Sequence, residues 1–246
     1  MKKIPVFLLG LLICGCLYAQ QINDPNAVKV DVKNFHGIDV SSAFDVYLTQ
    51  SKDEAVAVSA SDEKFRERIK VEVKDGILRI RYDNGLRWNN GKMKLKAYIS
   101  FINLDQLSAS GACDVFVIGD LKADELKIEL SGASDLKMTK AGDMKAEGKI
   151  DVKKLAVDLS GASDMKINGN ASQLKVEASG ASDFKGFDLT TDICDATASG
   201  ASNVQVTVNK ELSAHATGAS DVHYKGEGMI RDIKTSGASS VSKSRS

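Results

Sequence analysis

Proline and aromatic residues are scarce in this chain of 246 residues, and neither sign of charge predominates. The only prolines are Pro5 and Pro25, so a ladder of strands after them keeps every backbone donor. Aromatic residues make up 6% of the chain, which predicts a thin core of small and aliphatic side chains. Lys plus Arg and Asp plus Glu each number 33, and this balance argues against a nucleic-acid-binding protein, which would carry a basic excess.

Long apolar runs are also lacking, except at the N-terminus. Lys2 and Lys3 precede an apolar run from Ile4 to Ile13, which is too short to span a bilayer and suits the central part of a signal peptide. No later segment approaches 18 consecutive apolar residues. We therefore expect residues 1–19 to be a signal peptide and the mature chain to have no transmembrane span.

Two processing sites compete in this segment. The sequence Leu17-Tyr18-Ala19 fits ordinary signal peptidase, with Gln20 as the new N-terminus. The sequence Ile13-Cys14-Gly15 before Cys16 resembles a lipobox, which would attach a lipid to Cys16. Either route predicts an exported protein.

The motif Ser-Gly-Ala-Ser-Asp recurs through the C-terminal half of the chain. Its seven copies are centred on glycines that follow one another by 18 to 21 residues, with one step of 29: Gly111, Gly132, Gly161, Gly180, Gly200, Gly218 and Gly237. The aspartate position is occupied by Asp114, Asp135, Asp164, Asp183, Asn203 and Asp221, and by Ser240 in the last copy. Repetition at about this period is typical of stacked structural units.

Alternating apolar and polar residues flank each copy, as in Leu126–Leu130 before one motif and Leu136–Met138 after it. Alternation with a period of two predicts strands with one buried face. The sequence therefore predicts an all-β fold, a right-handed β-helix or β-solenoid with coils of about 20 residues, regular from about residue 108 to 240. Right-handed winding is expected because parallel crossover connections prefer it.

Each motif residue has an expected task in a corner between two strands. Glycine is expected to adopt a positive φ, and the small alanine to point into the crowded corner. Serine and aspartate are expected to hydrogen-bond nearby backbone groups. The aspartates would then form a surface column, with Lys137, Lys166 and Lys185 two positions further on to offset their repulsion.

Residues 26–108 also alternate, with a weaker repeat. Ser61 as the N-cap and the acidic residues after it predict a short helix through Arg68, and Asp75-Gly76 between two apolar strands predicts a hairpin. No linker rich in Pro, Gly or Ser separates the halves, so we expect one continuous domain over residues 20–246.

Three segments resemble the head GIN domain family of putative auto-transporter adhesins. They are Ile38–Leu48, Val71–Ile80 and Leu107–Val115. The resemblance covers residues 28–240 and implies a β-helix-like fold in an exported cell-envelope protein. It also implies a location in the periplasm, outer membrane or cell surface of a Gram-negative bacterium. It implies no catalytic residue at a position of this chain.

The candidate sites are weak. The aspartate column could bind Ca²⁺, but each corner supplies one carboxylate beside a lysine, whereas Ca²⁺ takes six to eight oxygens. We therefore expect neither metal nor cofactor. Cys113 and Cys194 lie four corners apart and are expected to stay unpaired. Trp88, in an irregular segment, is a weak candidate for stacking on a sugar.

These observations favour an adhesin-like or structural protein without catalytic activity, with an unidentified glycan or protein as surface ligand. The alternative is a β-helix that binds or processes carbohydrate as a lyase or hydrolase. Self-association through the ends of the stack is a further hypothesis, because open sheet edges must be capped or paired.

Overall fold

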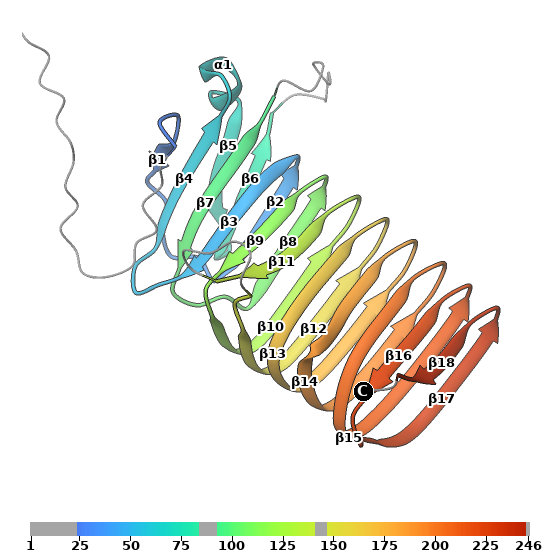
Figure 1. Ribbon diagram of the computed structural model, residues 1–246. Helices are drawn as coiled ribbons and strands as arrows, with labels where there is room; N and C mark the ends of the chain where they lie inside the picture. Colours follow the sequence, from blue (N-terminus) through green and yellow to red (C-terminus); the bar gives the residue numbers. More distant parts are fainter. Residues whose placement is uncertain (1–23, 84–92, 141–146, 245–246) are drawn as a thin grey trace, which may run out of the picture.

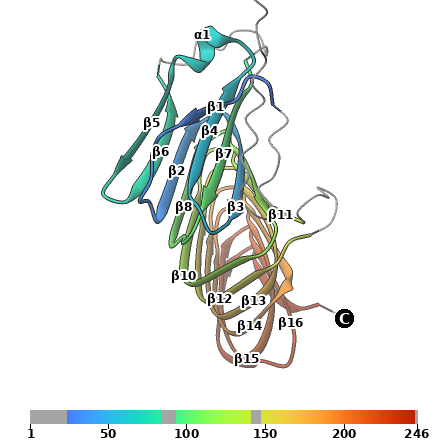
Figure 2. The ribbon, with the colours of Figure 1, turned by 90° about the vertical axis from the view of Figure 1, so that its left-hand side faces the viewer.

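The computed structural model describes residues 24–83, 93–140 and 147–244. These residues form one 18-stranded sheet that curls around its own core, so that two layers of strands face each other (Figures 1 and 2). One short helix, α1 (Glu63–Arg66), precedes β5. Its N-cap is Asp62, which accepts a hydrogen bond from the Lys64 amide, rather than the expected Ser61.

The first layer contains the strands that precede the motifs in the sequence. In order of pairing it consists of β5 (Ile69–Lys74), β6 (Ile77–Tyr82), β2 (Gly37–Ser42), β8 (Gln106–Gly111), β10 (Leu121–Leu130), β12 (Ile150–Leu159), β13 (Asp164–Ala178), β14 (Asp183–Ala198), β15 (Asn203–Gly218) and β17 (Met229–Gly237).

The second layer contains the strands that come after the motifs in the sequence. It consists of β1 (Val28–Val30), β4 (Ala55–Ala60), β7 (Leu95–Phe101), β3 (Phe44–Gln50), β9 (Asp114–Ile118), β11 (Asp135–Thr139), the first residues of β13, β14 and β15, then β16 (Asp221–Lys225) and β18 (Ser240–Lys243). The strands β13, β14 and β15 therefore bend from one layer into the other.

The prediction of a right-handed β-solenoid with uniform coils is wrong. The all-β class holds, but the sheet is mixed and nearly closed, with the shape of a barrel. β1 pairs with β4, β4 with β7, and β5 with β6, all antiparallel, whereas the remaining pairs are parallel. The motif period identified which strands are neighbours, but the antiparallel pairs join segments outside the period.

The core lies between the two layers and follows the alternation of the sequence. Every second residue of β7 is buried, from Leu95 to Phe101. Three phenylalanines, Phe44, Phe101 and Phe184, are fully buried, and alanines fill the core nearer the C-terminus, as at Ala214 and Ala216. Outward-facing side chains consequently line up in columns across neighbouring strands, and these columns form the surface available for binding.

Candidate functional site

The motif glycines stack at the turn from the first layer to the second. Their φ angles lie between 75° and 92°, a region that residues with a Cβ rarely adopt. In successive corners the alanine amide donates to the glycine carbonyl of the corner before, as from Ala181 to Gly161 at 2.7 Å. A Cβ on Gly180 would overlap that same carbonyl oxygen. Glycine is therefore required both for the turn and for the close approach of neighbouring corners.

The second serine of the motif, and not the alanine, points into the corner. Ser134, Ser163 and Ser220 are fully buried, whereas the motif alanines before them are exposed. The Ser220 hydroxyl contacts the Thr217 carbonyl at 2.8 Å and the Ala198 carbonyl at 3.0 Å. The expectation for alanine is wrong because the positive φ of glycine turns the following residue outward.

Cys113 occupies this serine position in the first copy. Its sulfur lies 3.4 Å from the Ser110 carbonyl oxygen, in the place where the Ser134 hydroxyl contacts the Ser131 carbonyl at 2.9 Å. Both Cys113 and Cys194 are buried and free, and burial raises the pKa of both thiols. Each therefore fills the core as a small side chain.

The motif aspartates form a column on the outer face of the second layer. Asp135 lies opposite Asp114, and Asp183 lies opposite both Asp164 and Asn203. Lys185 contacts the carboxylates of Asp164 at 3.2 Å and of Asp183 at 3.5 Å. Lys137 also lies 3.9 Å from Asp135, whereas Lys166 pairs with Glu147 outside the column. Lys137 and Lys185 thus offset the repulsion within the column, as ion pairs that are worth about 1 kcal/mol or less at a surface.

The column begins at Asp45 on β3, which the sequence motif does not include. Burial raises the pKa of Asp45, and the neighbouring carboxylate of Asp114 adds to the effect. No group of three or more His, Cys, Asp or Glu side chains within the described ranges is arranged to hold a metal ion. The column is therefore a row of single carboxylates on successive strands.

Three aromatic rings lie beside the start of this column. Tyr47 is stacked between Tyr98 and Phe116, with ring centroids 5.1 and 5.3 Å away. Tyr98 also donates a hydrogen bond to Asp24. Both faces of the Tyr47 ring are therefore covered by its neighbours, whereas a bound sugar would need an open ring face.

A groove of about 480 Å³ crosses the outer face of the first layer, over strands β10 to β14. Lys127, Ala156 and Lys175 lie side by side along one wall, and the small Ala156 leaves room between the two lysines. The other wall runs from Lys154 to Ile193, which is 42% exposed. The wall residues are Asp105, Lys127, Ala156, Lys175 and Asp195 on one side and Glu125, Lys154, Gln173 and Ile193 on the other.

The groove lysines are paired with carboxylates of their own surface. Lys127 contacts Glu129 at 2.6 Å and Asp158 at 3.6 Å, and Lys154 contacts Glu125 at 2.6 Å. The hydrogen bond between Lys127 and Glu129 raises the pKa of the lysine and lowers the pKa of the glutamate. The groove therefore presents positively and negatively charged side chains on neighbouring strands, which lie about 4.8 Å apart.

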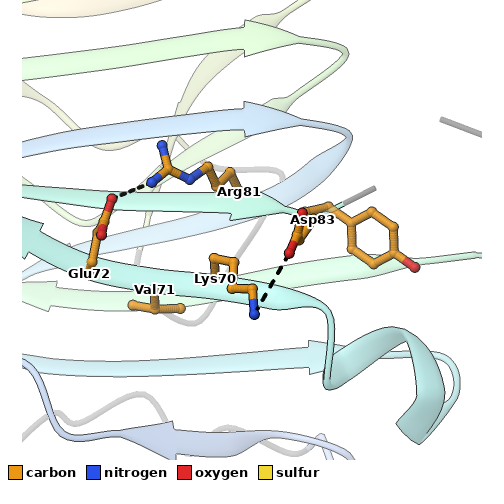
Figure 3. Close-up of a pocket in the computed structure, with 6 residues that line it drawn as sticks. Lys70, Val71, Glu72, Arg81 and Asp83 are labelled. Carbon is orange, nitrogen blue, oxygen red and sulfur yellow. Dashed lines mark hydrogen bonds and ion pairs between the residues drawn. The ribbon is translucent and has the colours of Figure 1, made fainter. Parts of the chain in front are cut away.

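A second hollow lies on the hairpin of β5 and β6 (Figure 3). Arg81 pairs with Glu72, and Lys70 approaches Asp83 at 3.8 Å. These side chains face one another across the two strands in Figure 3. Each charge of this hollow is thus already neutralised within a single hairpin, and the hollow is shorter than the groove across four strands.

The sequence predicted the corner residues, but it did not predict the groove. Trp88 and Cys16 lie outside the described residues, so both stay predictions. The groove had a weak signal in the sequence, namely Ala156 and Ile193 at outward positions that are otherwise polar. Only the strand register places these residues together.

The sheet and its surface columns define a class of elongated all-β protein with polar, repetitive outer faces. A family profile described as "Putative auto-transporter adhesin, head GIN domain" matches residues 34–228. The chain belongs to this family, as its resemblance in three segments indicated.

Solved structures of similar fold include proteins described as putative adhesins and as a putative lipid binding protein. A putative adhesin from Bacteroides fragilis is 23% identical, with a TM-score of 0.78 over 89% of this chain and 96% of that chain. A putative lipid binding protein from Parabacteroides distasonis is 17% identical, with a TM-score of 0.65 over 91% and 98%. A putative adhesin from Parabacteroides merdae is 19% identical, with a TM-score of 0.60 over 89% and 95%.

No curated protein matches the sequence. Among the residues that the structure describes, none of the helical segments has the length and apolar character needed to cross a membrane.

Proposed function

We propose that this protein is an exported, adhesin-like protein of the bacterial cell envelope that binds an extended polar ligand without transforming it. The observation that carries the proposal is the groove over β10 to β14, where lysine, glutamine and carboxylate side chains recur on successive parallel strands. Membership in a family of adhesins supports a binding role at the cell surface.

The shape and chemistry of the groove favour an extended chain over a compact small molecule. Its polar groups form two rows across the strands, and Ile193 adds an apolar contact at one end. An oligosaccharide or an extended peptide could hydrogen-bond to both rows at once. Of these two, we favour a glycan, because three lysines and three carboxylates, beside one glutamine, offer donors and acceptors to hydroxyl groups in equal measure.

The alternative, a carbohydrate-processing enzyme, has one observation in its favour. Asp45 has a raised pKa beside Asp114, which is the property of a general acid. However, neither of the two hollows described above includes Asp45. Incubation with uronate-containing polysaccharides is therefore expected to release no new reducing ends or unsaturated products, and release that is lost in Asp45→Asn would establish the enzyme.

Filling the groove is expected to abolish binding. In Ala156→Trp the indole would occupy the space between Lys127 and Lys175, so signals that the wild type gives on a glycan array should fall at least tenfold. Thr197→Trp is the matched control, because Thr197 also faces outward, on β14, but does not line the groove.

Three results on the array have separate meanings. Loss of binding in Ala156→Trp alone supports the groove. Equal binding by both variants contradicts it and directs attention to Trp88, which Trp88→Ala tests. No signal for the wild type contradicts the choice of a glycan, and an array of extended peptides with the same two variants then decides between peptide binding and no groove ligand.

Export is expected to leave one of two N-termini. Mass spectrometry of protein from bacterial membranes and periplasm should find Gln20 as the first residue, in line with the Leu17–Ala19 cleavage pattern. A diacylglycerol mass on Cys16 would instead identify a lipoprotein. An intact Met1 in the folded protein would contradict export.

A further inference from the structure

The two ends of the sheet are finished differently. At the N-terminal end the outermost strands are β5, which pairs antiparallel with β6, and β1, which pairs antiparallel with β4; α1 connects β4 to β5 (Figure 1). At the C-terminal end β17 pairs with β15, and β18 pairs with β16. In Figure 1 both strands are the outermost members of their layers. The C-terminal end therefore presents two open strand edges.

The core of the sheet is uncovered at this end. Ile230 lies opposite Leu212 and Ile233 lies opposite Ala214, and both partners are fully buried core residues. Ile230 and Ile233 nevertheless remain 45% and 39% exposed, and neighbouring Met229 is 56% exposed. Among the residues that the structure describes, no further strand lies beyond Ile230 and Ile233 in their columns.

We propose that a second copy of this chain docks on this end, with β17 of one copy antiparallel to β17 of the other. A twofold axis perpendicular to the first layer would pair the strands and keep inward-facing side chains inward. The exposed Ile233 of each copy would then lie opposite Ile233 of the other copy and cover it. Such an interface uses the same patch on both copies, as in most dimers of identical chains.

The charges of β17 select one register for this pairing. An axis of this kind places one residue opposite its own copy. Centring on Asp232 or Lys234 would bring like charges together, whereas centring on Ile233 puts Asp232 opposite Lys234 of the second copy on both sides of the axis. Ile233 is also the middle residue of Met229–Gly237, so this register pairs the full strand. Opposite charges directly across two strands stabilise the pair.

A second copy fits this edge better than an unrelated strand does. Charged residues and bulges on an edge strand normally prevent pairing, and β17 has Arg231, Asp232 and Lys234, with a bulge after Ile230. The pattern is self-complementary in one antiparallel register only. Head-to-tail stacking would instead set β17 against β5, the outermost strand of the first layer at the N-terminal end.

Light scattering coupled to size-exclusion chromatography tests the proposal on the purified mature protein. The wild type is expected to shift from monomer to dimer mass as concentration rises, and Ile233→Lys to raise the dissociation constant at least tenfold. Ile193→Lys is the matched control, since this exposed isoleucine of β14 lies away from the open end.

Two charge reversals provide a sharper test. Asp232→Lys and Lys234→Asp should each be monomeric, because like charges would face each other twice. Their equimolar mixture should form dimers, because every pair across the interface is then opposite in charge. Circular dichroism confirms that each variant folds, which matters because Asp232 also contacts His215 of its own chain at 3.0 Å.

A constant monomer mass of the wild type would overturn the proposal. So would a dimer that Ile233→Lys leaves intact, because the second copy would then dock elsewhere. A mixture that stays monomeric while the wild type dimerises would overturn the register centred on Ile233. Binding to the groove is expected to be unchanged in Ile233→Lys and in the two charge-reversal variants, so failure of this proposal and failure of the groove are distinguishable.

Discussion

Replacing Gly180 with alanine is expected to lower the free energy of unfolding by about 3 kcal/mol. The φ angle of Gly180 is 76°, which strains any residue with a Cβ. The added Cβ would also overlap the carbonyl oxygen of Gly161, the acceptor of the hydrogen bond from Ala181. The corner would have to separate from its neighbour, so strain and lost hydrogen bonding add together. Urea denaturation of the two proteins measures the difference.

Gly119→Ala is the matched control for this prediction. Gly119 has a φ of 85° but open space around its Cβ position. Alanine there should cost about 1 kcal/mol, the strain of the left-handed conformation alone. If the two substitutions cost the same, the close approach of corners is not what requires glycine. Valine at Gly180 should be at least as costly as alanine.

Replacing the buried Ser220 with alanine is expected to cost about 2 kcal/mol. Its hydroxyl contacts the carbonyls of Thr217 and Ala198, and its oxygen accepts from the Thr217 amide at 3.1 Å. Alanine would remove the hydroxyl group that contacts all three of these backbone groups in a buried corner. Ser220→Cys should cost clearly less, because Cys113 already fills the equivalent position with a sulfur contact.

Thermal and urea unfolding of the two Ser220 variants measure this difference. Ser240→Ala is the control, because the Ser240 hydroxyl bonds to Asp221 at an exposed site and its loss should change stability little. An alanine variant as stable as the wild type would show that the corner relaxes without the hydroxyl. A cysteine variant as unstable as the alanine variant would show that sulfur does not substitute for oxygen there.

The two corner residues illustrate what a pattern of residue types can predict. A glycine that recurs at one period points to a backbone requirement, and the left-handed φ of Gly180 has that physical cause. The serine that follows it two positions later was expected to cap backbone groups at the corner. This serine lies in the core and the alanine before it lies outside. Their placement depends on the direction in which the chain leaves the turn.

The candidate groove shows the limit of the same approach. One wall of the groove combines Lys127, Ala156 and Lys175. Ala156 follows Lys127 by 29 residues and precedes Lys175 by 19, and only the parallel pairing of β10, β12 and β13 brings the three side by side. The uneven step arises from extra residues before β12, part of which lie at 141–146, outside the described residues. A motif search responds to regularity, whereas this groove exists because one column has a small residue between two large ones.

By itself the sequence determined that the chain is all-β, which strands of the repeat are neighbours, and where the corners need glycine, because alternation and a repeated turn are local properties. Only the tertiary structure decided that the sheet is mixed and nearly closed, with its antiparallel pairs at one end. Curling and closure depend on contacts between residues far apart in the chain. The exposed Ile233 has the same hydrophobicity as a buried isoleucine, and its exposure follows from the absence of a further strand beyond β17 among the described residues.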